Sequence, residues 1–421
     1  MRKLLAFLAA LAAAEGASAQ SVVLFGVVDT GITYIQTNSS YVGIPGRPLM
    51  NYAGASTASQ SQWSMTNSNY NASRLGFRGT EDLGGGLAVA FWLEAAISSD
   101  DGTLGFTGFN RRSTVSLLSN VGEIRLGRDY VPTFWNDDLF DPFGTNGIGQ
   151  SLVYQMNIAP RDVNFGATNH YLFGNANATR ASNSIGYFLP AGLGGFYGQA
   201  MYAFNEAVKY DPGGTTPLKP INQRSGGYAG ARFGYSYGQL DIAASYGETT
   251  TGDDYYQGIT TKVTIVNLGA SYDFGVVKFT GEIARTRNIN EYVVPPLIGT
   301  GDFKGDGYLL GAIVPVGVGF IRVAYSHVNL NYTAPPTGTA PIVSAAAEQP
   351  SGGRLALGYV YNLSQRTALY ATTAYVKNRN GAAFIVPGNN VPVFFNDYFK
   401  TGSGYKANYL IGYEFGIRHA F

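Results

Sequence analysis

The sequence predicts an all-β protein that crosses a membrane as an antiparallel β-barrel of sixteen strands. The first observation is composition: the 421 residues include 56 Gly, 25 Phe and 30 Tyr, and only 13% of the residues are charged. Aromatic residues favour strands and glycine favours tight turns, whereas soluble domains carry about 25% charged residues. The outer surface of the folded chain is therefore not expected to face water everywhere.

The charge and cysteine counts exclude several classes of function. The chain has no cysteine, which excludes a disulfide scaffold, thiol catalysis and zinc–thiolate sites. It has 28 basic and 27 acidic residues, so its net charge is close to zero and no nucleic-acid partner is expected. The three histidines are scattered, and we expect no metal site and no cofactor.

Residues 1–19 have the pattern of a cleaved signal peptide. Arg2 and Lys3 precede an apolar run that is too short to span a bilayer, and Ala17-Ser18-Ala19 resembles a cleavage site. The alternative, an N-terminal core helix, fits poorly because Glu15-Gly16 interrupts the run. We therefore expect an exported mature chain of residues 20–421 that forms one barrel domain.

The second and third observations concern the rest of the chain. No later segment is long and apolar enough for a transmembrane helix, and only helices and closed barrels satisfy every backbone polar group in lipid. The final segment instead alternates with a period of two. One face is apolar and aromatic, and the other is small or charged, as expected between lipid and a water-filled lumen. The first face holds Tyr409, Ile411, Tyr413, Phe415, Ile417, His419 and Phe421, and the second holds Leu410, Gly412, Glu414, Gly416, Arg418 and Ala420.

Turn signals divide the chain into sixteen such strands joined alternately by short turns and long polar connections. An even strand number places both termini and the short turns on the periplasmic side and the long loops outside, and sixteen strands leave an aqueous channel. The first strand is apolar on both faces in its first half, either from local propensity or because it contacts another subunit. The predicted strands are 22–35, 72–81, 87–97, 111–119, 122–128, 183–189, 195–204, 226–237, 239–248, 263–274, 276–286, 306–315, 319–330, 353–362, 366–377 and 408–421.

Several motifs resemble those of the Gram-negative general porins of the betaproteobacterial trimeric type. They are Ser21–Asp29, Ser73–Leu87, Phe91–Glu94, Leu126–Tyr130, Asp141–Gly144 and the terminal Phe421.

This resemblance implies a homotrimer in the cell outer membrane, in contact with lipid and lipopolysaccharide, through which small hydrophilic solutes and ions diffuse passively. Phe421 resembles the terminal aromatic residue that the barrel-assembly machinery reads. Alternatively, Phe421 only ends a lipid-facing row.

The third long connection, residues 129–182, exceeds the length of an ordinary loop and is expected to be functional. In the family it folds into the lumen and narrows it. Here it carries Asp137, Asp138 and Asp141, which we expect at the narrowest section of the pore.

Arginines on the wall are expected to face these acids. Alternation directs Arg74, Arg78 and Arg112 into the lumen, with Arg111 at a strand end. By resemblance, Arg74, Arg111 and Arg180 match the basic cluster of the constriction, although Arg112 could replace Arg111. Opposed charges produce a transverse field that gives weak selectivity. The alternative is that each arginine merely pairs with a nearby carboxylate such as Glu94.

Two other functions were considered. A substrate-specific channel would use the aromatic-rich stretch Trp135 to Phe143 as a binding surface. A barrel enzyme would need a histidine beside a serine, but Ser326 and His327 are adjacent on a strand and point to opposite faces. We therefore expect a passive channel and not an enzyme.

Overall fold

The computed structural model describes a chain that is almost entirely β-strand. The predicted signal peptide, residues 1–19, lies outside the described residues. The structure describes residues 22–41, 56–102, 108–158, 175–206, 209–210, 221–222, 224–254, 259–292, 302–333, 349–380, 382, 384–386 and 405–421.

The barrel is closed by pairing of its first and last strands. β1 (Val23–Tyr41) runs antiparallel to β19 (Tyr405–Ala420). On its other edge, β1 pairs with β2 (Thr57–Asn67) over one half and with β3 (Arg74–Gly84) over the other. The seventeen strands of the sheet therefore occupy sixteen positions around the ring, which confirms the predicted strand number.

The remaining elements follow the chain around the barrel. A separate hairpin of β9 (Lys209–Tyr210) and β10 (Ile221–Asn222) lies apart from the main sheet. None of the helices in the described ranges is long and apolar enough to span a membrane. The other elements are β4 (Leu87–Ala96), β5 (Arg112–Ser119), β6 (Gly122–Tyr130), α2 (Pro132–Phe140), α3 (Leu152–Ile158), β7 (Arg180–Phe188), β8 (Phe196–Ala203), β11 (Tyr228–Tyr237), β12 (Leu240–Asp254), β13 (Ile259–Asp273), β14 (Lys278–Tyr292), β15 (Asp302–Val316), β16 (Gly319–Thr333), β17 (Ser351–Asn362) and β18 (Thr367–Arg379).

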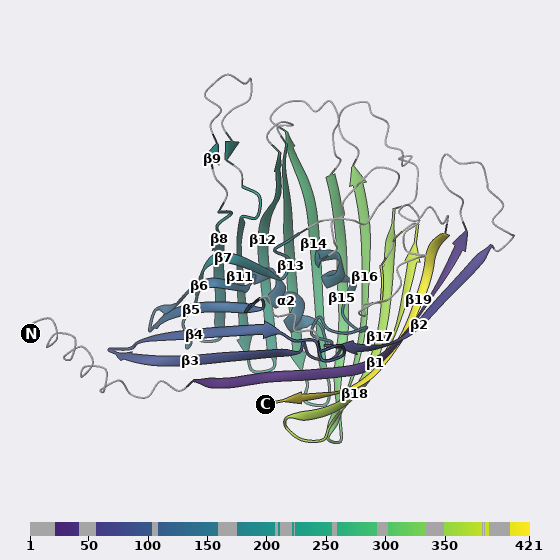
Figure 1. The fold of residues 1–421 in the computed structure, drawn as a ribbon, viewed down its shortest axis with the longest axis horizontal. Helices are drawn as coiled ribbons and strands as arrows, with labels where there is room; N and C mark the ends of the chain where they lie inside the picture. Colours follow the sequence, from purple (N-terminus) through teal and green to yellow (C-terminus); the bar gives the residue numbers. More distant parts are fainter. Residues whose placement is uncertain are drawn as a thin grey trace, which may run out of the picture.

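The strands are strongly tilted around the barrel. In Figure 1, β3 to β6 cross the view almost horizontally, whereas β12 to β16 stand nearly upright. Strands of a closed barrel tilt by about 35–45° to the axis, so strands on facing walls cross at a large angle. The helix α2 lies among the strands, within the ring.

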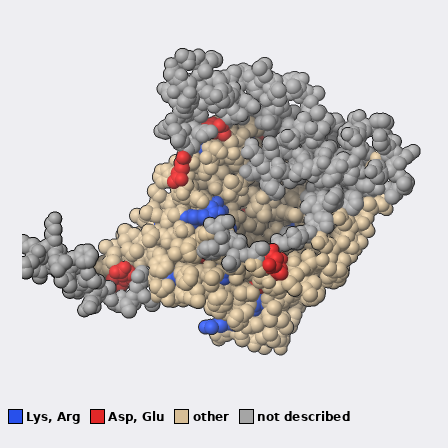
Figure 2. Space-filling view, viewed as in Figure 1, with Lys and Arg blue, Asp and Glu red and all other residues tan. Residues whose placement is uncertain are grey.

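The predicted alternation between the two faces is present in the structure. In β19, the side chains of Tyr413, Phe415 and Ile417 are 47–48% exposed, whereas Glu414 between them is buried in the lumen. The face drawn in Figure 2 is dominated by uncharged residues. An outer surface of this kind is stable only in an apolar medium, which agrees with a transmembrane barrel.

The sequence placed several strand ends wrongly. The segment 36–71 was expected to be one long loop, but β1 continues to Tyr41 and β2 occupies Thr57–Asn67. Likewise β12, predicted to end at residue 248, continues to Asp254. These additional lengths lie at the long-loop ends of the strands and are polar. Beyond the membrane, both faces of a strand contact water. Backbone hydrogen bonds to the neighbouring strands maintain it there, and its residues need not alternate between apolar and polar.

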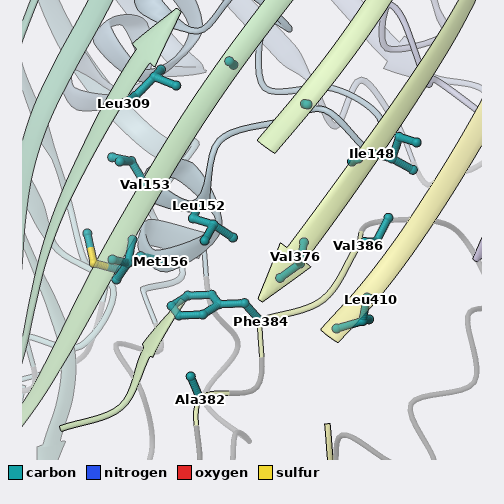
Figure 3. Close-up of a cluster of buried hydrophobic side chains, with 14 of the residues drawn as sticks. Ile148, Leu152, Val153, Met156, Leu309, Val376, Ala382, Phe384, Val386 and Leu410 are labelled. Carbon is teal, nitrogen blue, oxygen red and sulfur yellow. The ribbon is translucent and has the colours of Figure 1, made fainter. Parts of the chain in front are cut away.

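The main hydrophobic core lies inside the barrel. Figure 3 shows Leu152, Val153 and Met156 of α3 packed against wall residues such as Leu309 and Val376. These side chains belong to one buried cluster, which also contains Ile148 of the same loop. Burial of a leucine-sized side chain contributes roughly 1.5–3 kcal/mol. The cluster therefore holds the third loop firmly against the wall.

Glycines on the inner wall allow this close packing. A side chain at Gly269 of β13 would overlap the ring of Phe140, and one at Gly311 of β15 would overlap Pro142. The loop thus lies directly on the backbone of the wall at these points.

A methyl group at Gly269 should displace the loop. We expect Gly269→Ala to lower the free energy of unfolding by about 1–3 kcal/mol and to change the single-channel conductance, because Phe140 must move. Urea unfolding in detergent and planar-bilayer recording measure the two effects. The control is Gly281→Ala on β14, where the nearest atoms to a new methyl group are 3.4 and 3.6 Å away. Equal behaviour of the two variants would contradict this packing.

Candidate functional site: the constriction

The third loop contains two short helices, and the sequence explains where the first begins and ends. Val131 has extended backbone angles and Pro132 follows as the first helical residue, a position where proline is favoured. The helix ends at Phe140 because Asp141 precedes Pro142, and a residue before proline is driven out of the helical region. The helix α2 is thereby confined to nine residues.

Buried amides attach α2 to the wall. Asn136 donates to the Ala243 carbonyl at 3.0 Å and to Asn267 Oδ1 at 3.1 Å. Arg232 Nε donates to Asn136 Oδ1 at 2.5 Å. Because these groups are buried, leaving any of them unpaired would cost about 1–3 kcal/mol. The network therefore determines where the helix lies.

Asp137 is part of this attachment. Its carboxylate is fully buried and accepts hydrogen bonds from Asn157 at 2.9 Å and from Asn267 at 3.1 Å. Burial raises the pKa of Asp137 above its ordinary value. The side chain points to β13 and β14 and not to the predicted arginine cluster.

Asp141 holds the loop in its folded shape. Its two oxygens accept hydrogen bonds from the backbone N–H of Phe143 at 2.9 Å and of Ser151 at 2.8 Å. Burial raises the pKa of Asp141 to about 6, and these two hydrogen bonds oppose the increase. Like Asp137, Asp141 is enclosed. The sequence predicted both acids at the opening, but in the structure both hold the loop in place.

The wall strands also hold the loop further along the chain. Glu414 accepts a hydrogen bond from Ile148 N–H at 3.0 Å, and Ser326 Oγ accepts one from Leu152 N–H at 2.9 Å. Arg354 donates to the Gln150 carbonyl, to Gln155 and to the Ile385 carbonyl. Arg354 therefore joins the third loop to a second inward segment, residues 384–386, whose Phe384 and Val386 belong to the same buried cluster.

Asp138 is the acid that faces the arginines. It is half-buried, accepts a hydrogen bond from Thr145 Oγ1 at 3.1 Å, and interacts electrostatically with Arg74, Arg111 and Arg180. Burial raises its pKa, while Thr145 and the three arginines oppose the shift. One carboxylate of the loop thus lies opposite three guanidinium groups, from β3, from the residue before β5 and from β7.

The arginines are positioned by a tyrosine and a glutamate. Arg111 contacts Glu94 at 2.6 Å, and both Arg111 and Arg180 donate to the hydroxyl of Tyr130, at 2.7 and 2.8 Å. The Arg180 guanidinium also lies 4.3 Å from the centre of the Tyr130 ring. Arg111 is therefore ion-paired, as the alternative explanation of the sequence stated, whereas Arg74 and Arg180 form no ion pair with any described residue.

Arg112 and Arg78 lie in a different group. Arg112 is 3.3 Å from Asp129, and both Arg112 and Arg78 lie over the ring of Trp92. The structure therefore associates Arg111, and not Arg112, with Asp138 and Arg180.

Sequence reasoning missed the groups that depend on packing. Asn136, Asn157, Asn267 and Arg354 give no local signal, because their partners are far away in the chain. Arg128 was also missed; it lies at a bulge between Gly127 and Asp129, and its guanidinium donates to Ser182 Oγ at 2.8 Å.

The barrel and its internal loop define a class of protein, the outer-membrane channels. The chain belongs to the Gram-negative porin family, whose model matches residues 5–381. It is similar to outer membrane porin protein 32 of Delftia acidovorans, with 34% identity over 423 residues that cover 100% of both chains. It also shares 30% identity with an outer membrane porin protein of Bordetella pertussis, over 90% of this chain and 95% of the relative.

A solved structure agrees with the fold. The anion-selective porin from Comamonas acidovorans matches with a TM-score of 0.69 and 33% identity, over 96% of this chain and 100% of that chain. The chain is therefore an outer-membrane general diffusion porin and not an enzyme. The positions of Ser326 and His327 agree: Ser326 is buried against α3, while His327 is half-buried beside Tyr308.

Asp138 should make ion selectivity depend on pH. Its raised pKa means that protonation begins above the usual range, and loss of its negative charge leaves the arginines unopposed. One charge at about 8 Å in water is worth roughly 0.5 kcal/mol for each ion, with opposite sign for anion and cation, so the ratio of anion to cation permeability should rise roughly five-fold as the pH falls. Reversal potentials in a salt gradient measure this ratio.

The variant Asp138→Asn should show the higher anion preference already at neutral pH. It should also lose most of the dependence on pH. Thr145→Val, which removes only the hydrogen-bond donor, serves as the control and should raise the pKa of Asp138 further. A wild-type pH dependence in Asp138→Asn would contradict this assignment.

Proposed function

We propose that the opening of this porin favours small anions. The observation that carries the proposal is the imbalance of charge around Asp138. Three guanidinium groups, those of Arg74, Arg111 and Arg180, lie around the opening, and the carboxylates of Asp138 and Glu94 oppose them. Asp137 and Asp141 are enclosed in the loop packing.

Burial of charge explains how a nearly neutral chain can have a selective opening. Ions respond to charges within about one Debye length, which is about 8–10 Å at physiological salt. Enclosed carboxyl groups that are hydrogen-bonded to the loop contribute less than the half-exposed guanidinium groups of Arg74 and Arg180. The name of the Comamonas relative, an anion-selective porin, is consistent with this inference.

We also propose that residues 1–19 are a cleaved signal peptide and that the mature barrel assembles as a homotrimer in outer-membrane lipid. Val22, Leu24, Val28 and Ile32 are exposed apolar side chains on and beside β1, where a neighbouring subunit could pack. Phe421 would serve as the signal for the barrel-assembly machinery. Its N–H and carbonyl pair with Gly26, so the terminal residue also closes the ring.

A substrate-specific channel is the second candidate. The stretch Trp135 to Phe143 was expected to offer an aromatic binding surface. However, Phe140 and Phe143 are buried against the wall, and Phe134 packs on Tyr130 and Tyr154. These contacts favour the general pore.

Removing the unpaired arginines should abolish the anion preference. We expect Arg74→Gln together with Arg180→Gln to shift the reversal potential toward the cation side at low salt, with the difference decreasing near 1 M salt, where the Debye length is about 3 Å. The control is Arg285→Gln with Arg224→Gln, two exposed arginines, one midway along β14 and one before β11. Equal reversal potentials for the wild type and the variant Arg74→Gln with Arg180→Gln would refute the proposal.

A further inference from the structure

A second basic site lies in the lumen, away from the opening at Asp138. It is a cleft of about 370 Å³ formed by β1, β3, β4, β5 and β6. Its lining includes Arg78, Trp92, Arg112, Glu123 and Arg125. The cleft lies toward the short turns, since Arg125 is only three residues beyond the turn at Gly122. A solute that has passed the constriction from the long-loop side therefore meets this cleft next.

The alternation of the strands directs these side chains into the pore. Phe77, Val115 and Ile124 are exposed on the outer face, so their neighbours Arg78, Thr114 and Arg125 lie on the inner face. The row of Phe77, Val115 and Ile124 faces lipid. The cleft is on the opposite side of the same strands and is therefore open to the aqueous lumen.

The guanidinium groups of the cleft outnumber its carboxylates. Arg125 contacts Glu123 at 2.8 Å and Asp129 at 2.5 Å, and Arg112 is 3.3 Å from the same Asp129. Arg78 has no carboxylate partner among the described residues. The cleft therefore has one excess positive charge.

Aromatic rings hold two of the guanidinium groups in place. The Arg78 guanidinium lies 5.5 Å from the centre of the Phe25 ring and 5.1 Å from that of Trp92, and Arg112 lies 4.5 Å from Trp92. Trp92 is fixed in turn by a hydrogen bond from its Nε1 to Glu94 at 3.1 Å. Stacking on an aromatic face leaves the edge donors of a guanidinium available. Arg78 and Arg112 are thus oriented before any ligand arrives.

We propose that this cleft binds small divalent oxyanions, such as phosphate or a short dicarboxylate, as they pass through the pore. The excess positive charge attracts a divalent oxyanion about twice as strongly as chloride, and the oxyanion has enough acceptors for the forked donors of two arginines. The proposal rests on the inferred anion preference of the channel. It adds a binding step on the side of the short turns that slows multivalent anions relative to chloride.

The test is block of chloride current by inorganic phosphate, at about pH 8 where phosphate is mostly divalent. Added phosphate should reduce the chloride conductance of the wild type in a saturable way. In Arg78→Gln with Arg112→Gln, the half-blocking concentration should rise about ten-fold, which corresponds to the loss of about 1.4 kcal/mol of charge-assisted hydrogen bonding. Arg78→Lys, which keeps the charge but loses the fork, should give an intermediate value.

The control is Arg366→Gln on the turn between β17 and β18, which removes one arginine outside the cleft. It should retain the wild-type half-blocking concentration, and heat-modifiable migration in gels should show that every variant is folded. Linear, unsaturated reduction of current in the wild type, or equal block in the folded double variant, would overturn the cleft proposal. If the reversal potential of the wild type lies on the cation side, the inferred anion preference itself is wrong. Failure of the cleft proposal and failure of the anion preference are therefore distinguishable.

Discussion

The whole structure depends on the closure of the hydrogen-bonded ring between β1 and β19. In lipid an open sheet edge would expose a row of unpaired N–H and C=O groups, and each would cost several kcal/mol. Pairing runs from Val27 opposite Ala420 to Tyr41 opposite Tyr405, and the backbone of Phe421 adds a further pair with Gly26. Once the ring is closed, side chains must alternate between lipid and lumen. The apolar outer band and the polar interior follow from this one constraint.

The lumen is shaped by the way a loop is fitted to the wall. Wall glycines such as Gly269 and Gly311 permit contact with the backbone, while Asn136, Asn157 and Asn267 satisfy the polar groups that this contact buries. The attachments of the loop lie on the side of β11 to β19, so the loop leaves its other side open toward β3 to β7. The arginines of that wall consequently border the remaining water. Because the loop lies against one wall, its packing is concentrated there, and the charged side chains that face water are on the opposite wall.

The sequence predicted the features that repeat or depend on local pattern. The period-2 rows of β19 identified the lipid-facing side chains, and the motif around Arg74 and Arg78 located β3 and its inner face. The strand β2 was missed because Trp63 and Met65 are the two large apolar residues in an otherwise mostly polar segment. The residues of the constriction were harder to assign, since Asp137, Asp138 and Asp141 are indistinguishable in the sequence. Their different environments arise from Asn267, Thr145 and the Ser151 N–H, and only Asn267 is remote in the chain. The direction of each side chain from a short helix, rather than its type, decides which acid meets the arginines.

The position of the third loop can be measured directly by cross-linking, because the chain contains no cysteine of its own. A β-carbon at Gly412 would lie 3.3 and 3.6 Å from Cδ1 and Cγ2 of Ile148, and 2.8 Å from Cγ1 of Val386, so side chains at positions 148 and 412 are in direct contact. The doubly substituted Ile148→Cys, Gly412→Cys protein should cross-link on mild oxidation and retain the conductance of its reduced form. Pairing Gly412→Cys with Leu139→Cys, on the exposed side of α2, should give no cross-link. A folded barrel in which the first pair stays reduced, or in which oxidation changes the conductance, would show that the loop does not rest on this wall.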